Sequence, residues 1–263
     1  MSLETLASRA VSAGYGALCM RASQVGVHSD PTAVREAAGV LQKHGLKVTM
    51  VTGDFDIVYN NDAGPGCLRR ITRYLDLAQA FDAPLLRVAL KTQGDIPWAQ
   101  RAADEAAERG LKLAHQCHTQ SLFETVDGIL RTLRLINRPN FGLIFEPANL
   151  ELCGQSYVPD TIRCLAPWLF NVYLQNQVLK PDGKLTLLTW CRGPVPFDLL
   201  PLHQPGGLDF SAVFEALTAN GYDGALTVHQ AQSENEEVGE MIRAAADYLR
   251  QRRFRLRPLA KPV

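Results

Sequence analysis

The chain repeats one kind of junction between a helix and a strand. A glycine follows an amphipathic helical stretch and precedes an apolar, strand-like run at four places: Gly14, Gly45, Gly110 and Gly221. Glycine closes the last turn of a helix well because it adopts positive φ without strain. Repeated helix-to-strand units predict an α/β fold with a parallel sheet, in which ligands bind at the carboxyl ends of the strands.

Hydrophobic periodicity extends this alternation along the whole chain. We expect strands at residues 17–21, 47–52, 85–90, 112–118, 142–146, 171–175 and 225–229. We expect helices at residues 3–13, 31–44, 67–81, 99–109, 122–136, 159–165, 209–220 and 234–250. The long segment 178–205 is rich in Pro and Gly and is expected to form loops over the ligand site. Seven strands that begin after a helix predict a TIM-type (β/α) barrel without its first strand.

Length and composition limit the domains and the partners. A chain of 263 residues with 46% hydrophobic residues suits a single barrel, placed at residues 1–250, with the basic segment 251–263 as a solvated tail. The 27 basic and 27 acidic residues leave no net charge to attract nucleic acid or a membrane, so a small-molecule substrate is expected. The absence of a signal peptide and of a long apolar run predicts a cytoplasmic protein with reduced cysteines.

Polar residues occupy the last positions of several expected strands. Because alternate residues of a strand point to the same side, counting in twos finds those that face into the barrel. The residues found in this way are Gln116, His118, Glu146, Tyr173, Gln175 and His229. Such side chains are costly to bury in an apolar barrel without partners. We therefore predict a ligand site at this rim.

Two segments of the chain resemble the sugar phosphate isomerase/epimerase family, the xylose-isomerase-like TIM barrels. They are Phe145-Glu146-Pro147-Ala148-Asn149-Leu150 and Gly206-Gly207-Leu208-Asp209-Phe210. The order of helices and strands supports the resemblance over most of the chain. The resemblance implies isomerase or epimerase chemistry, by proton transfer next to a carbonyl, on a sugar or a related polyhydroxy compound.

The family's divalent metal is held by Glu, Asp, His and Glu at the ends of four strands. The resemblance places Gln116, Glu146, Tyr173 and His229 at these positions, so only one carboxylate remains. Gln and Tyr are weaker ligands for a divalent ion than carboxylate and imidazole. His118 keeps the histidine of the family's Glu-x-His on the first of these strands.

Three hypotheses stay open. In the first, His118, Glu146 and His229 form a rebuilt site for a divalent metal such as Mn, Zn or Mg. In the second, Glu146 or His229 is the acid and base without a metal, and His118 is a further candidate catalytic residue. The substrate is then bound by Gln116, Tyr173, Gln175, Asn149, Arg21 and Arg87. Of these, Arg21 and Arg87 suit a carboxylate or phosphate, although they suit internal salt bridges equally well.

The third hypothesis is a non-catalytic descendant of the family that binds a sugar-like ligand or a protein partner. The loss of most expected metal ligands favours it. The missing first strand leaves two sheet edges, and an exposed edge invites pairing with another chain. We expect either a second copy, in a homodimer, or the C-terminal tail to cover this place.

Overall fold

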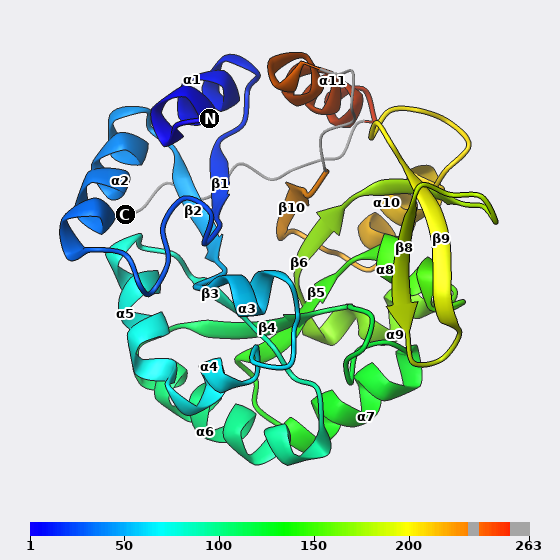
Figure 1. Cartoon of the computed structure of the whole chain (residues 1–263), viewed down its shortest axis with the longest axis horizontal. Coiled ribbons are helices and arrows are strands. Elements are labelled where there is room, and N and C mark those ends of the chain that lie inside the picture. Colours follow the sequence, from blue (N-terminus) through cyan, green and yellow to red (C-terminus); the bar gives the residue numbers. More distant parts are fainter. Residues whose placement is uncertain (231–236, 253–263) are drawn as a thin grey trace.

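A ring of parallel strands surrounded by helices makes up the computed structural model, which describes residues 1–230 and 237–252 (Figure 1). The strands are β1 (Ala17–Met20), β2 (Lys47–Val51), β3 (Leu85–Val88), β4 (Lys112–Gln116), β5 (Phe141–Phe145), β6 (Leu169–Leu174) and β10 (Ala225–Val228). They pair in parallel in this order as one seven-stranded sheet. The predicted barrel of seven strands is confirmed.

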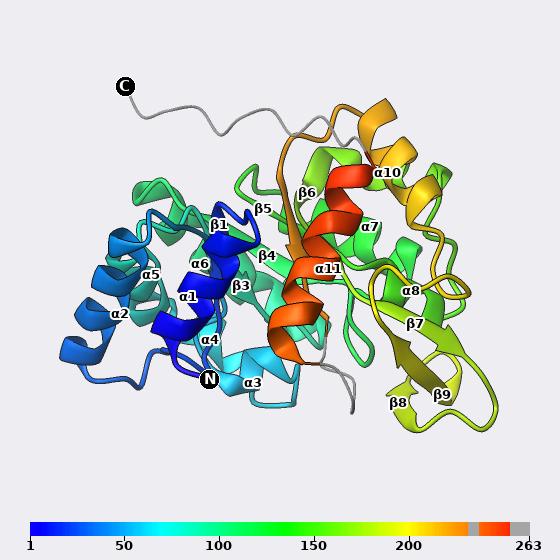
Figure 2. The same cartoon turned by 90° about the horizontal axis from the view of Figure 1, so that it is seen from above.

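Helices alternate with the strands and cover the outside of the barrel (Figures 1 and 2). The longer ones are α1 (Leu3–Ser12), α2 (Pro31–Lys43), α5 (Ile71–Ala80), α6 (Ile96–Glu108), α7 (Val126–Ile136), α10 (Phe210–Ala219) and α11 (Val238–Gln251). The shorter ones are α3 (Phe55–Val58), α4 (Gly66–Arg69), α8 (Pro147–Leu152) and α9 (Asp160–Leu165), with 3₁₀ turns at Gln93–Asp95 and Ala166–Trp168.

The glycine junctions end their helices as the sequence predicts. After α2, Gly45 has a φ of +66°, its N–H donates to the carbonyl of Gln42, and the N–H of Leu46 donates to the carbonyl of Leu41. These two bonds form a Schellman motif, which satisfies carbonyl groups that the end of a helix leaves free. Gly110 ends α6 with the same pair of bonds, to Ala106 and Ala107.

The segment expected to form loops, residues 178–205, instead contributes most of a second sheet. The strands β7 (Asn176–Leu179), β8 (Leu185–Thr189) and β9 (Gly193–Leu200) pair in antiparallel fashion in the order β7-β9-β8. Val195 and Phe197 on β9 are buried with Leu152 of α8. Pro194 and Pro196 alternate with these residues and hide the strand pattern in the sequence, so the loop prediction was wrong.

Several predicted boundaries also change. The helix predicted at 67–81 is broken at Arg70, whose φ of −129° and ψ of 34° are not helical, into α4 and α5. The helix predicted from 122 begins at Val126, because the Thr125 side chain accepts a hydrogen bond from Gly128 N–H and caps it. Strand β6 ends before Gln175. Residues 234–236 of the last predicted helix and residues 253–263 of the predicted tail lie outside the described residues.

Helices α1 and α11 lie side by side over the place where the barrel is not closed (Figures 1 and 2). Strands β1 and β10 stand at the two ends of the strand order and pair with each other nowhere in the described residues. The Tyr15 hydroxyl donates to the carbonyl of Ile242 at 3.2 Å, and Arg250 Nη2 donates to the carbonyl of Ala13 at 2.8 Å. That a second copy of the chain covers this place stays a prediction. Light scattering in solution tests it by measuring the oligomeric state.

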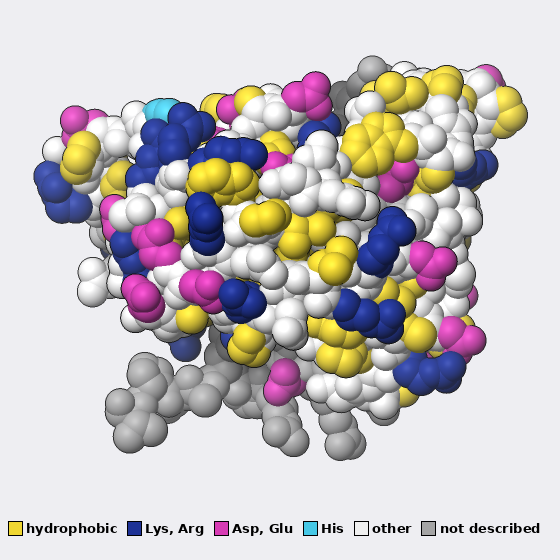
Figure 3. Space-filling view, turned by 90° about the horizontal axis from the view of Figure 1, so that it is seen from below, with side chains coloured by type: hydrophobic (Ala, Val, Ile, Leu, Met, Phe, Trp, Pro, Cys, Tyr) yellow, Lys and Arg dark blue, Asp and Glu magenta, His cyan; other side chains and the backbone are white. Residues whose placement is uncertain are grey.

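Charged side chains of both signs are interspersed on the face in Figure 3, with hydrophobic side chains in small groups between them. This distribution agrees with the balanced composition of the chain. Within residues 1–230 and 237–252, no helix has both the length and the apolar character needed to cross a bilayer.

Candidate active site

Alternate residues of the strands fill the inside of the barrel. Five buried side chains from five strands form its inner cluster: Met50, Leu85, Ala114, Ile144 and Tyr173. Gln116 follows Ala114 by two residues, and Glu146 follows Ile144 by two, so both continue on the inner side toward the carboxyl end. The alternation counted in the sequence thus places the predicted residues at the mouth of the barrel.

Glu146 is held by three nitrogen donors. The amides of Gln116 and Asn149 donate to its Oε2, and Nδ1 of His229 lies 3.1 Å from its Oε1. Asn149 reaches this position because α8 begins directly after β5, and its amide also donates to the carbonyl of Cys117 at 2.9 Å. Glu146 is only 1% exposed, and a buried carboxylate needs such donors.

These contacts determine the charge of Glu146. Burial raises the pKa of its carboxyl group, but the hydrogen bond with His229, the charge of His229 and the hydrogen bond from Gln116 act in the opposite direction. The net result is a lowered pKa. Glu146 is therefore an ionised carboxylate at neutral pH.

His229 is fixed on two sides and accessible on a third. It continues β10, and its backbone N–H donates to the carbonyl of Leu174 at 2.9 Å. Its ring stacks on Tyr173, with 4.3 Å between the ring centroids, while Nδ1 contacts Glu146. The other ring nitrogen, Nε2, has no hydrogen bond to any described residue, and the side chain is 22% exposed. Nε2 is thus the nitrogen that can meet a ligand.

Tyr173 is a buried partner of this histidine. Its hydroxyl lies 3.8 Å from Sγ of Cys19 on β1, and burial raises its pKa well above the ordinary value. Tyr173 is therefore a neutral phenol under all ordinary conditions. Its ring positions His229 by stacking, and its hydroxyl turns toward the first strand of the sheet.

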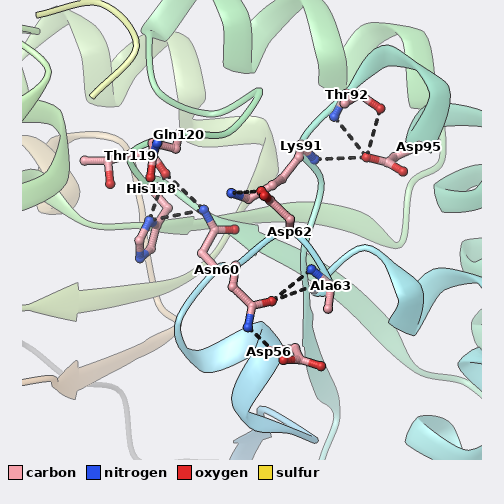
Figure 4. Close-up of polar contacts among 12 residues, drawn as sticks. Asp56, Asn60, Asp62, Ala63, Lys91, Thr92, Asp95, His118, Thr119 and Gln120 are labelled. Atoms are coloured by element: carbon pink, nitrogen blue, oxygen red, sulfur yellow. Dashed lines mark hydrogen bonds and ion pairs between the residues drawn. The ribbon is translucent and has the colours of Figure 1, made fainter. Parts of the chain in front are cut away.

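His118 is neutral and fixed by a loop (Figure 4). Its Nδ1 lies 3.0 Å from the carbonyl oxygen of Thr119, and its Nε2 has no hydrogen bond to the described residues. Asn60, in the loop after α3, donates to the same carbonyl at 3.0 Å and lies 3.3 Å from Nδ1. Burial and the charge of Arg87 lower the pKa of His118 to about 4.

The two predicted arginines lie at the mouth without carboxylate partners. Arg87 on β3 is 2% exposed, and its Nη2 donates a long hydrogen bond of 3.4 Å to the carbonyl of Val58, while Nε is buried without a partner among the described residues. Arg21 directly follows β1 and is half-buried, and its side chain makes no hydrogen bond or ion pair to the described residues. Within residues 1–230 and 237–252, neither arginine forms the internal salt bridge that the sequence left open.

Two contributors to the site were not predicted. Cys19 was detectable, because it precedes Arg21 by two residues on an inward-facing register. Asn60 was not, because it lies 58 positions from His118 in the sequence, in a loop whose path the pattern does not define. Gln175, which we predicted to bind substrate, lies half-buried between β6 and β7.

The profile of the family described as xylose isomerase-like TIM barrel matches residues 7–252. The chain belongs to this family. A curated relative, the inosose dehydratase of Geobacillus thermodenitrificans, is 24% identical over 143 residues. The matched part is 52% of this chain and 46% of that protein, so the chain matches less than half the length of this relative.

Solved structures share the fold across nearly the whole chain. The probable 3-DHS dehydratase AsbF from Bacillus anthracis has a TM-score of 0.71 at 15% identity, covering 95% of this chain and 94% of that one. D-allulose 3-epimerase from Methylomonas sp. has a TM-score of 0.69 at 18% identity, covering 95% and 91%. A xylose isomerase-like protein from Mycobacterium smegmatis, solved in complex with magnesium, has a TM-score of 0.69 at 14% identity, covering 95% and 87%.

The residues at the family's metal positions do not fit a divalent ion in this chain. A carboxylate at position 116 could share a metal ion with Glu146, but Gln116 instead donates its amide N–H to Oε2 of Glu146. Asn149 donates another amide N–H to the same oxygen. Tyr173 is a neutral phenol stacked on His229. Amide and imidazole groups therefore already contact both oxygens of the one carboxylate, and the Gln and Tyr at the other positions are weak ligands for a divalent ion.

The rebuilt metal site stays a prediction. In the part of the chain that the structure describes, no hydrogen bond or ion pair joins His118 to Glu146 or His229. Atoms that could ligate a metal ion lie within 4.8 Å of one another at a different place, formed by Glu124, Cys153 and Cys191. Elemental analysis of protein purified without chelator or nickel affinity tests the prediction, and near-stoichiometric metal that His118→Gln removes would support it.

Proposed function

We propose that this protein transfers protons next to a carbonyl group of a sugar or a related polyhydroxy compound, with His229 as the acid and base. The observation that carries the proposal is the contact of His229 Nδ1 with the buried, ionised Glu146 at 3.1 Å. A histidine oriented by a carboxylate is a common general base near neutral pH. Glu146 acts through His229 and is a positioning residue.

The chemistry follows from this contact. Nε2 of His229 removes a proton from the carbon next to the carbonyl, the electron pair left on carbon moves toward the carbonyl oxygen, and an enediolate forms. The imidazolium that results is stabilised by the negative charge of Glu146. Return of a proton from solvent to the opposite face of the same carbon gives an epimer, and its return to the former carbonyl carbon gives an isomer. In a dehydration, the hydroxyl on the next carbon leaves and takes the proton of the imidazolium, so that water is released.

The relatives support this reaction class. Epimerisation beside a carbonyl and dehydration of a β-hydroxy carbonyl compound both begin by removal of the same kind of proton. The names of similar proteins include D-allulose 3-epimerase and inosose dehydratase. The structural likeness concerns the fold, so the reaction class is proposed from the site together with these names.

Deuterium exchange tests the proposal without knowledge of the product. Ketohexoses, including D-allulose, and inososes are incubated with the protein in D₂O, and incorporation into the carbon-bound positions is followed by NMR and mass spectrometry. His229→Gln is expected to lower the exchange rate by about 10²–10⁴-fold, as loss of a general base does. Full exchange by this variant would contradict the proposal.

Matched variants distinguish a catalytic from a structural effect. His44→Gln changes a histidine at the end of α2, where it contacts Glu4 near the surface, and is expected to leave the rate unchanged. Glu146→Gln is expected to lower the rate and to move the acid limb of the pH–rate profile to lower pH, because the imidazolium loses its negative neighbour. A lower rate with an unmoved profile would assign Glu146 a merely structural role.

A non-catalytic binding protein is the second candidate. Gln116 and Tyr173 stand where the family carries ligating side chains, and this replacement favours loss of the ancestral activity. Saturable binding of a sugar with no deuterium incorporation at any tested position would support this candidate over the enzyme.

A further inference from the structure

The mouth of the barrel contains a buried positive charge without a bound negative partner. Arg87 is 2% exposed, its Nε has no acceptor, and no carboxylate lies within ion-pair distance among the described residues. Buried charges in proteins are normally paired, because removing an unpaired ion from water is costly. An arginine kept in this state therefore indicates a negative group that arrives from outside.

Arg21 stands next to Arg87 in the same inward register. Leu85 belongs to the inner cluster of the barrel and Cys19 packs against it, and each arginine follows one of these two residues by two positions. The charges of the two guanidinium groups act on each other, and Arg87 also experiences the charge of Glu146. Strands β1 and β3 thus bring two cations to the mouth of the barrel.

The acid that lies nearest cannot neutralise both arginines. Glu146 is already engaged by Gln116, Asn149 and His229. Burial and the charge of Arg87 keep His118 neutral, so it supplies no negative charge. Lys91 adds a cation near this region, but it pairs with Asp62 at 3.1 Å (Figure 4). With one carboxylate against two guanidinium groups, the mouth keeps a net positive charge.

We infer that Arg87 and Arg21 form an oxyanion subsite, and that the ligand of this barrel carries a carboxylate or a phosphate. The inference rests on the proposed function in taking that ligand to be the substrate. A guanidinium group offers parallel N–H donors that match the oxygens of either anion. The anionic end of the substrate then lies at β1 and β3, and the reacting carbon lies toward His229 at the end of β10.

Anion binding tests the subsite directly. Malonate and inorganic phosphate are titrated into the protein at low ionic strength by isothermal calorimetry. Arg87→Met and Arg21→Met are each expected to weaken binding by at least about tenfold, since hydrogen bonds to charged groups are among the stronger ones. Arg87→Lys is expected to lose less, because it keeps the charge. Arg134→Met, an exposed change on α7, serves as the matched control.

The outcomes separate the two anions and decide the inference. Tighter binding of malonate assigns a carboxylate, and tighter binding of phosphate assigns a phosphate. Equal affinity of wild type, Arg87→Met and Arg21→Met, or no binding of either anion by the wild type, would overturn the subsite. Circular dichroism checks folding, and if Arg87→Met unfolds, Arg21→Met at its half-buried position keeps the test valid.

The subsite and the proposed function fail in different ways. Deuterium exchange is compared between a neutral ketohexose and a keto acid of the same chain length. Exchange of the keto acid at equal rates by wild type and Arg87→Met would overturn the subsite and leave proton transfer standing. Arginine-dependent anion binding without exchange into any compound would support the subsite and contradict the enzyme.

Discussion

The barrel has a closed side, formed by β3, β4 and β5, and an open side, formed by β1 and β10. Every residue of β5 is buried between two neighbouring strands, whereas every residue of β10 is half-buried and the strand pairs only with β6. The candidate site combines the two sides, because Glu146 follows β5 and His229 follows β10. The closed side thus holds the ionised Glu146, and the open side supplies His229, whose Nε2 is accessible to a ligand.

Matched leucines test this difference with the largest expected effect. Leu143 on β5 and Leu226 on β10 both contact the layer between sheet and helices, but Leu143 is fully buried and Leu226 is only partly so. We expect Leu143→Ala to lower the free energy of unfolding by about 2–5 kcal/mol, as cavity-forming substitutions do. Leu226→Ala is expected to cost about 1 kcal/mol, in proportion to the smaller apolar area it removes from contact. Urea denaturation measures both, and equal losses would mean that the open side is as well packed.

Acid should act on the closed side through His115 of β4. This residue is fully buried, its Nδ1 lies 2.9 Å from the carbonyl of Val88, and burial lowers its pKa to about 3 from 6.5. Between these values the unfolded chain binds the extra proton, so stability is lost as the pH falls from about 6.5 toward 3. His115→Gln removes this titrating group and is expected to reduce the loss of unfolding free energy at pH 4 by about 2–4 kcal/mol.

Urea denaturation at pH 7 and pH 4 measures this effect, as the change in free energy of unfolding between the two values. His44→Gln at the surface is the control, and it should follow the wild type. A variant His115→Gln that loses as much stability as the wild type would place the acid sensitivity elsewhere in the fold.

The contact of α1 with α11 gives the smallest effect. Tyr15→Phe removes the hydrogen bond from the hydroxyl to the carbonyl of Ile242 and is expected to cost about 0.5–1.5 kcal/mol. Because this bond spans the open side, amide hydrogen exchange should become faster in β10 and α11 and stay the same in β4 and β5. Tyr59→Phe, at a 66% exposed position after α3, is the control. Uniformly faster exchange would show that the two sides unfold as one unit.

The sequence predicted the barrel well where the pattern is local. Four glycine junctions, seven strands and most helices follow from capping chemistry and from the period of apolar residues. The sequence prediction failed where the spacing of apolar residues in the sequence did not reveal the secondary structure. Prolines alternating with Val195 and Phe197 concealed β9, and apolar residues that keep the helical spacing on both sides of Arg70 concealed the break there.

The candidate site was predicted as a set of residues and not as a set of contacts. Counting in twos placed Gln116, Glu146 and Tyr173 on the inner side, as the inner cluster indicates. Their partners depend on rotamers at the mouth, which no periodicity encodes. That Gln116 donates to Glu146, and that Tyr173 stacks on His229, became visible only in three dimensions.

Local rules by themselves determined the parallel barrel, its seven strands and the inward face of each, because helix caps and strand alternation involve residues close together in the chain. The tertiary structure alone decided which polar groups touch. Glu146 meets His229 across 83 positions of sequence, and Arg87 finds no carboxylate at all among the described residues. Such pairings depend on how the strands close around a common axis, and that closure is set by the packing of the whole chain.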